Sequence, residues 1–157
     1  MKENSIPFQR TGTGPHRFRM PGWIACAPFE KLLNINIIEA SQGRAELTMP
    51  FLIEYAQGAG LMHGGALVTL ADTAVVMAIK SLLTPETHFA TITLDVKYLL
   101  PVTQGIITAK AKIVEKEGRT LKGQATLFDE GNRSVLEFNS TFKIAKDARI
   151  KNVTFEK

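Results

Sequence analysis

An aspartate interrupts a long apolar stretch of this chain. The segment from Ala66 to Leu83 consists almost entirely of apolar, helix-forming residues, yet Asp72 lies in its middle. A lone carboxylate on an apolar helix costs free energy unless it is hydrogen-bonded or faces a cleft. Asp72 is therefore either a satisfied core residue, bonded to a threonine or to the backbone, or a group that acts as nucleophile or as general base toward water.

The residues just before this stretch offer a place for a carbonyl oxygen. Gly64 and Gly65 follow His63 at the predicted start of the helix, where backbone N–H groups lack partners and carry a partial positive charge. Glycine there lets a substrate approach the backbone closely, although a tight turn would also explain it. Gln57, in the preceding loop YAQGAGLM, either bonds that carbonyl or places a water, or is an ordinary polar loop residue.

One long helix must position these groups. Gly64 and Gly65 open it and Thr84-Pro85 closes it, which gives roughly 19 residues, or about 28 Å at the rise of an α-helix. Because it is apolar on nearly every side, we expect it to be buried nearly all round. Met62 and Met77 either line a substrate tunnel beside it or belong to the plain core.

Strand patterns surround the helix. Residues 28–33 predict a short helix, and residues 35–50 predict two strand segments or one bent strand. In residues 89–101 the alternation predicts one face with Ala90, Ile92, Leu94, Val96 and Tyr98, and the other with Thr91, Thr93, Asp95 and Lys97. Residues 105–115, 120–129 and 134–144 alternate similarly, with glycine-containing turns between them. These patterns predict an α+β fold in which an antiparallel sheet curls around one helix.

The motif HGGALVTLADTA resembles the signature of hotdog-fold acyl-CoA thioesterases, in particular the phenylacetate-degradation type. In that family an acidic residue follows the histidine by nine positions, as Asp72 follows His63, and a Gln or Asn precedes it by six, as Gln57 does. The segment ATITLDVKYLLPV resembles the family's next strand, and Thr91 falls where some members carry a Ser or Thr near the catalytic water or carboxylate. The resemblance covers roughly residues 28–145.

This resemblance implies a hotdog fold, a homodimer or dimer of dimers, and hydrolysis of a CoA thioester without metal or cofactor. The Gly64 N–H would polarise the thioester carbonyl, Asp72 would attack it or activate water, and Gln57 would orient the nucleophile. His63 and Gly65 would belong to the substrate-binding turn, with the His63 side chain supporting the turn rather than transferring protons. A non-catalytic acyl-CoA-binding module and a hotdog dehydratase or hydratase are the alternatives. The acid at position 72 argues against the binding module. The lack of a Pro-Gly close behind His63 argues against the dehydratase or hydratase.

Spacing on the helix predicts that the site needs two chains. Gly64 and Asp72 are eight residues apart, or about 12 Å along the axis, so one carbonyl cannot touch both on one helix. A two-fold axis near Val68 would place Gly64 of one copy opposite Asp72 of another. Each site would then combine Gln57 and Gly64 of one chain with Asp72 of its partner.

Composition narrows the function classes. The 157 residues fit one domain, and the net charge of +4 comes from scattered Lys and Arg, with mild clusters at 10–19 and 143–151. That pattern indicates a solvated surface or attraction for an anionic small molecule rather than nucleic-acid binding. The three histidines lack zinc-type spacing, no apolar run suits a membrane span, and the single Cys26 fits a cytoplasmic protein.

Three segments are expected along the chain: an N-terminal arm at 1–27, the hotdog domain at 28–145 and a C-terminal tail at 146–157. Residues 1–20 show no strand or helix period, so we expect their deletion to cost little stability. The sequence does not name the acyl group. The candidates for binding the CoA phosphates are basic residues near predicted strand ends, namely Arg44, Lys97, Arg119 and Lys143.

Overall fold

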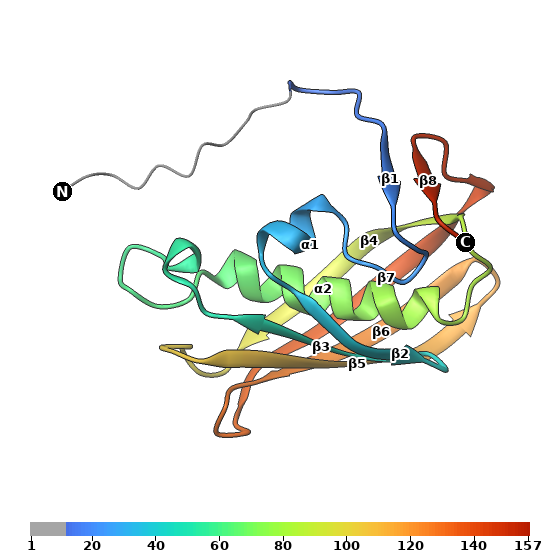
Figure 1. Ribbon diagram of the computed structural model, residues 1–157. Helices are drawn as coiled ribbons and strands as arrows, with labels where there is room; N and C mark the ends of the chain where they lie inside the picture. The colour runs from blue at the N-terminus through green and yellow to red at the C-terminus, as the bar shows by residue number, and fades with distance from the viewer. Residues whose placement is uncertain (1–11) are drawn as a thin grey trace.

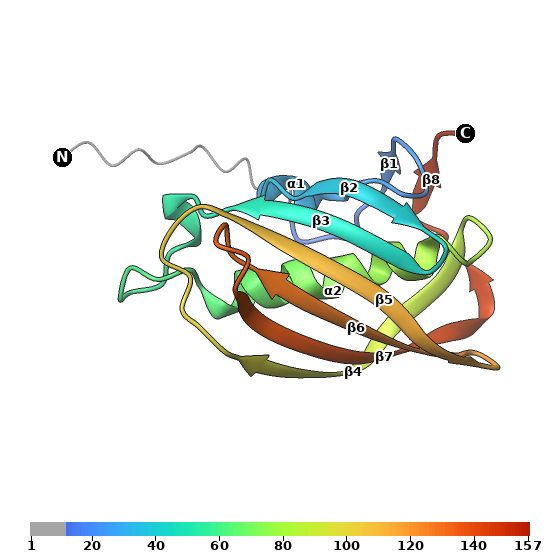
Figure 2. The ribbon, with the colours of Figure 1, turned by 90° about the horizontal axis from the view of Figure 1, so that it is seen from below.

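The computed structural model describes residues 12–157, and it confirms the α+β fold (Figure 1). One long helix, α2 (Gly64–Lys80), lies in the hollow of a six-stranded antiparallel sheet. Viewed from the sheet side, the strands curve beneath the helix (Figure 2). Across the sheet the order is β2 (Asn36–Ser41), β3 (Arg44–Pro50), β5 (Ile106–Glu117), β6 (Thr120–Phe128), β7 (Ser134–Arg149) and β4 (Thr87–Tyr98).

The core forms where the inner face of the sheet meets α2. Alternate residues of β3 point inward and are fully or nearly fully buried, as the period-2 pattern predicted for Ala45, Leu47 and Met49. The sheet approaches the helix most closely at Gly123 on β6, where an added Cβ would collide with Val75. Met62 and Met77 both belong to this core, being 4% and 1% exposed. The plain core role, rather than a tunnel lining, therefore describes both methionines in this chain.

Helix α2 is shorter and more open than the sequence predicted. It ends at Lys80 rather than at Leu83, because the Ser81 hydroxyl donates to the Ala78 carbonyl and accepts from Gly43 N–H, which turns the chain toward β3. The expectation that α2 is buried nearly all round is wrong for one side of this helix in the single chain. A stripe of partly exposed residues runs along that side at helical spacing, formed by Val68, Thr69, Asp72, Val76 and Lys80.

Strand β4 contains a β-bulge that the alternation did not predict. Pairing with β7 is regular from Tyr98 to Thr93, shifts by one residue, and continues from Thr91 to Phe89, before a second irregularity between Phe89 and Thr87. Partners in an antiparallel pair share a face, so Thr91, opposite the buried Phe142, lies on the helix side together with Leu94 and Val96. The predicted face that joined Ala90 and Ile92 to Leu94, Val96 and Tyr98 is therefore wrong, since the bulge exchanges the two faces at this point.

The segments at both ends of the described chain pair with each other. Strand β1 (Phe18–Met20) runs parallel to β8 (Val153–Phe155), and Met20 is buried. The expectation that residues 1–20 lack strands is thus wrong for 18–20, while residues 1–11 lie outside the described part. Helix α1 (Pro28–Leu32) and a 3-10 turn, η1 (Ile53–Tyr55), complete the elements, and β7 continues four residues beyond the expected domain end at 145.

Residues 12–157 contain neither a membrane-spanning helix nor a metal-binding cluster. Within that range no helix is both long and apolar enough to span a membrane. The same residues contain no group of three or more His, Cys, Asp or Glu side chains arranged to hold a metal ion.

Candidate active site

Asp72 lies on the partly exposed side of α2 and faces β4. The Thr91 hydroxyl donates a 3.1 Å hydrogen bond to its Oδ1. Burial raises the pKa of the Asp72 carboxyl, the Thr91 hydrogen bond lowers it, and the negative charge of Glu30 on α1 raises it further. The bulge in β4 is what turns Thr91 toward the helix. The carboxylate is thus held by one hydroxyl and still reachable from the open side.

The N-terminus of α2 is capped by its own histidine. His63 Nδ1 accepts a 2.8 Å hydrogen bond from Gly65 N–H. Nδ1 therefore carries a lone pair, and the proton of the neutral ring is on Nε2. The first intrahelical bonds run from Ala66 and Leu67 to the His63 carbonyl, so the Gly64 N–H precedes them. Gly65 N–H is occupied by the cap, and Gly64 N–H is the terminal amide that points out of the helix.

A tyrosine that was not expected at the site lies over Gly64. A Cβ added to Gly64 would lie 2.8 Å from the Tyr98 hydroxyl oxygen, so any other residue at this position would require the Tyr98 ring to move. Tyr98 is the last residue of β4 and is 55% exposed. In the sequence, the segment Tyr98-Leu-Leu-Pro indicated only the end of a strand. In the fold, this strand end lies beside the start of α2, which brings Tyr98 to Gly64.

Gln57 lies in a short, closed loop before the helix. Its backbone N–H bonds the Leu61 carbonyl, and its side-chain Oε1 accepts from Ala59 N–H. Because Oε1 is used within the loop, the Nε2 hydrogens are the atoms that Gln57 can offer to a ligand. A Gln57 that bonds a substrate carbonyl or a carboxylate would act as a donor.

Within one chain the helix separates the candidate groups. Gly64 and Asp72 lie on one continuous helix, about 12 Å apart along its axis. Thr91 is brought to Asp72, and Tyr98 is brought to Gly64, but the two pairs stay at different points along the helix. One carbonyl group therefore cannot contact both the Gly64 N–H and the Asp72 carboxylate of a single chain.

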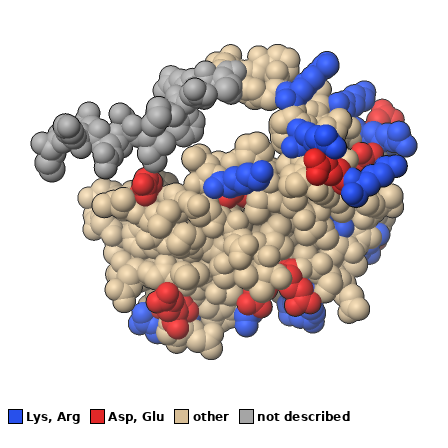
Figure 3. Space-filling model, viewed as in Figure 1, with Lys and Arg blue, Asp and Glu red and all other residues tan. Residues whose placement is uncertain are grey.

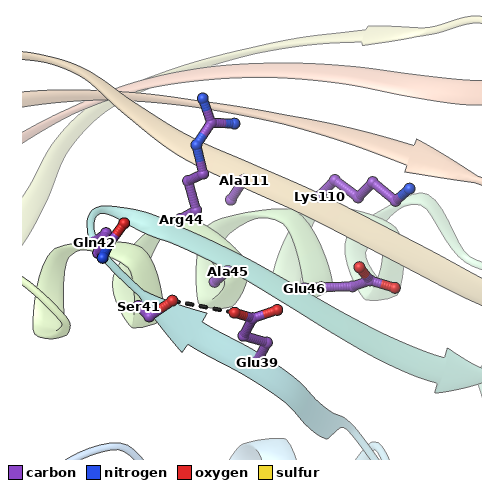
Figure 4. A pocket seen from close by; sticks show the side chains of 8 residues that line it. All are labelled: Glu39, Ser41, Gln42, Arg44, Ala45, Glu46, Lys110 and Ala111. Atoms are coloured by element: carbon purple, nitrogen blue, oxygen red, sulfur yellow. Dashed lines mark hydrogen bonds between the residues drawn. The ribbon is translucent and has the colours of Figure 1, made fainter.

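The candidate phosphate-binding residues do not converge. Arg44 lines a hollow of about 310 Å³ on the outer side of β2, β3 and β5, together with Lys110 and the carboxylates of Glu39 and Glu46 (Figure 4). This hollow is at the opposite edge of the sheet from β4 and carries both signs of charge. Arg119 instead donates to the Ile144 carbonyl at the β5–β6 turn, and Lys97 and Lys143 lie on β4 and β7.

Basic residues gather at one end of the molecule. Figure 3 shows Lys and Arg side chains concentrated over the end where β1 and β8 pair, with a few acidic residues among them. Within the described residues, the end of the first basic stretch forms part of β1, which pairs with β8, and β8 follows directly after the second stretch, 143–151. One pair, Arg19 with Glu156, is bridged at 3.1 Å.

Comparison with known proteins agrees with this architecture. The model of the thioesterase superfamily matches residues 59–136, which include α2 and β4. A candidate esterase of Pasteurella multocida is 34% identical over 98 residues, covering 62% of this chain and 70% of that protein. A candidate esterase of Halobacterium salinarum is 37% identical over 87 residues, and the match covers 52% of this chain and only 57% of that protein.

A solved structure shows the same fold. The PaaI protein from the phenylacetic acid degradation operon of Escherichia coli superposes with a TM-score of 0.70 at 24% identity, covering 83% of this chain and 88% of that chain. An antiparallel sheet wrapped around one long helix defines the hotdog class. The chain belongs to the thioesterase superfamily, a family of thioester hydrolases, and the predicted likeness to PaaI proteins is confirmed at the level of the fold.

Proposed function

We propose that this protein is an acyl-CoA thioesterase that releases a free acid and CoA. The observation that carries the proposal is the Asp72 carboxylate, bonded by Thr91 and placed on the partly exposed side of an otherwise apolar helix. A carboxylate in that position costs free energy, and catalysis accounts for it. A module that only binds acyl-CoA would gain nothing from this charge.

The chemistry needs one carboxylate and one oxyanion donor. Either Asp72 attacks the carbonyl carbon, CoA leaves as the thiolate, and water then hydrolyses the acyl-carboxylate anhydride, or Asp72 takes a proton from the water that attacks. Both routes place negative charge on the carbonyl oxygen. The Gly64 N–H, reinforced by the partial positive charge of the helix N-terminus, stabilises that charge. Gln57 Nε2 orients the nucleophile.

The complete site combines two copies of the chain. The exposed stripe of α2 begins at Val68, which is midway between Gly64 and Asp72. A two-fold axis there sets Gly64 of one copy opposite Asp72 of the other. Strand β4 is an edge strand whose outer backbone groups have no strand partner within the described chain, and Ile92 and Leu94 on it are 55% and 48% exposed. An exposed apolar edge beside an exposed helix stripe favours a homodimer. In the dimer of dimers, two such homodimers associate.

Release of free thiol from a panel of acyl-CoAs tests this function. We expect turnover of at least one thioester and no consumption of enoyl- or hydroxyacyl-CoA by hydration or dehydration. Tight binding of acyl-CoA without thiol release would instead establish a binding module. Interconversion of enoyl- and hydroxyacyl-CoA would establish a hydratase, and either result would overturn the proposal.

A further inference from the structure

A cavity lies beside the Asp72–Thr91 pair. It has a volume of about 190 Å³, is partly open to solvent, and is lined by residues of α2, β4, β7 and the N-terminal arm. One end is formed by Thr91, the residue that bonds Asp72. The other end is formed by Lys80, which follows Asp72 by eight residues, or about 12 Å, on α2. The cavity thus runs along the helix, away from the carboxylate and toward the helix C-terminus.

The sides of this cavity are mainly apolar. Val76 forms the helix side, and Phe89 and Phe142 form the sheet side, with their ring centroids 6.0 Å apart. Phe89 faces inward because the bulge in β4 shifts residues 89–91 by one position relative to residues 93–98. An apolar cavity that begins at Thr91, the residue that bonds the Asp72 carboxylate, suits the apolar part of an acyl group, whose carbonyl would lie at Asp72.

A tryptophan from the N-terminal arm closes the far end. Trp23 Nε1 donates to the Lys80 carbonyl at 3.0 Å, and Lys80 Nζ donates to the Trp23 carbonyl, also at 3.0 Å. The Lys80 ammonium also lies 4.6 Å from the centroid of the Trp23 ring. Phe155 on β8 packs edge-on against the same ring at 5.4 Å. Three contacts to the indole and one to the backbone carbonyl, made by Lys80 of α2 and Phe155 of β8, therefore fix Trp23 at the end of the cavity.

We propose that this cavity is the acyl pocket and that Trp23 sets its length, so that the protein selects short apolar acyl groups. The inference rests on the proposed thioesterase function. A dry cavity of about 150 Å³ is known to hold a benzene ring, so 190 Å³ accommodates about six to eight carbon atoms beyond the carbonyl. Longer acyl chains would collide with Trp23.

Substitution of Trp23 tests the pocket. We would measure kcat/KM over linear acyl-CoAs from two to twelve carbons and over aryl-CoAs, for the wild type and for Trp23→Ala. Since one methylene in an apolar pocket changes rates about 10- to 200-fold, the ratio of decanoyl to hexanoyl turnover should rise at least about tenfold in Trp23→Ala. The control is Phe18→Ala, which truncates another aromatic residue of the arm outside the cavity. Its ratio should stay that of the wild type.

A second variant acts from the opposite side of the pocket. Val76→Leu adds one methylene to a half-buried helix position and should lower hexanoyl relative to acetyl turnover about tenfold. This variant decides the matter if circular dichroism shows that Trp23→Ala does not fold. Unchanged chain-length preference in the folded variants would overturn the inference.

The wild type separates this inference from the proposed function. If it hydrolyses no thioester, the proposed function fails. Binding of non-hydrolysable thioether analogues of the same chain lengths, measured by calorimetry, then still tests the pocket. A wild type that binds or hydrolyses dodecanoyl groups as well as hexanoyl groups would contradict a pocket closed by Trp23.

Discussion

The Thr91 hydroxyl and the Asp72 carboxylate meet at 3.1 Å although 19 residues separate them along the chain. The contact joins the middle of the central helix to the edge strand, at the point where a β-bulge interrupts the strand. Without the bulge, strict alternation from Leu94 would turn Thr91 to the outer face. The hydrogen bond therefore depends on a local irregularity of the sheet.

Asp72→Asn should abolish most thioesterase activity while the fold survives. Asparagine keeps the volume and can still accept the hydrogen bond from Thr91, but it is neither a nucleophile nor a base. Steady-state thiol release and circular dichroism check the two parts of this prediction. Turnover within a few-fold of the wild type would remove Asp72 from the mechanism, and an unfolded variant would make Asp72 a structural residue.

The same variant should be more stable than the wild type at neutral pH. Burial raises the pKa of Asp72 in the folded state above its value of about 3.9 in an unfolded chain. Between those two pKa values the folded state binds more protons, so wild-type stability falls as the pH rises through this window. The melting temperature of Asp72→Asn should exceed that of the wild type at pH 7, and the difference should vanish below about pH 4. An equal difference at both pH values would contradict the raised pKa.

Thr91→Val should slow turnover and shift its pH dependence. The hydroxyl lowers the pKa of Asp72 by bonding the carboxylate, so its removal raises that pKa. A hydrogen bond to a charged group contributes at least about 1.5 kcal/mol. If the transition state loses this amount, kcat should fall about tenfold. The acid limb of the kcat–pH profile should also move to higher pH. Thr91→Ser is the matched control, because it keeps the hydroxyl and should retain the wild-type profile.

Mixing two inactive variants should restore activity. If each site takes Gln57 from one chain and Asp72 from its partner, a dimer of Asp72→Ala with Gln57→Ala holds one intact site and one with both defects. Random exchange of equal amounts then returns roughly a quarter of wild-type activity. Mass spectrometry of labelled chains would verify the exchange. Proven exchange with no recovery would place the whole site within one chain.

His63→Ala should destabilise the protein through the helix N-terminus. The substitution removes the acceptor of Gly65 N–H. Loss of an N-cap typically costs about 1 kcal/mol, and for a chain of this size the melting temperature should fall by about 2–4 °C. His63→Asn keeps a side-chain acceptor and should recover most of the loss. A melting temperature unchanged in His63→Ala would show that the cap adds no stability.

The sequence predicted the architecture because hydrophobic periodicity determines it. The α2 helix and the four strands β4 to β7 lie within about five residues of their expected ranges, because the periodic placement of apolar residues marks each of them. The motif around His63 and Asp72 also marked the helix start and its polar midpoint. These features depend on residues close together in the chain, so sequence patterns can predict them.

Other features depend on contacts distant in sequence. The bulge at Thr91 follows from how β4 fits β7, and alternation alone assigned Ala90 and Ile92 to the wrong face. Strand β1 is three residues long and exists because β8 pairs with it from the other end of the chain. Trp23 looked like part of a polar arm, and only its hydrogen bonds with Lys80 show that it lies against the helix.

The bulge in β4 also restricts which strands can join this edge. An edge strand with free backbone groups is open to any flat extended chain, which is how many proteins aggregate. The bulge between Thr91 and Thr93 shifts the register of β4 by one residue. The free N–H and C=O groups at the outer edge of β4 therefore do not alternate regularly along the whole strand. A regular strand from an unrelated protein could match one half of this edge but not both. The irregularity that turns Thr91 toward Asp72 thereby also protects the sheet against indiscriminate strand addition.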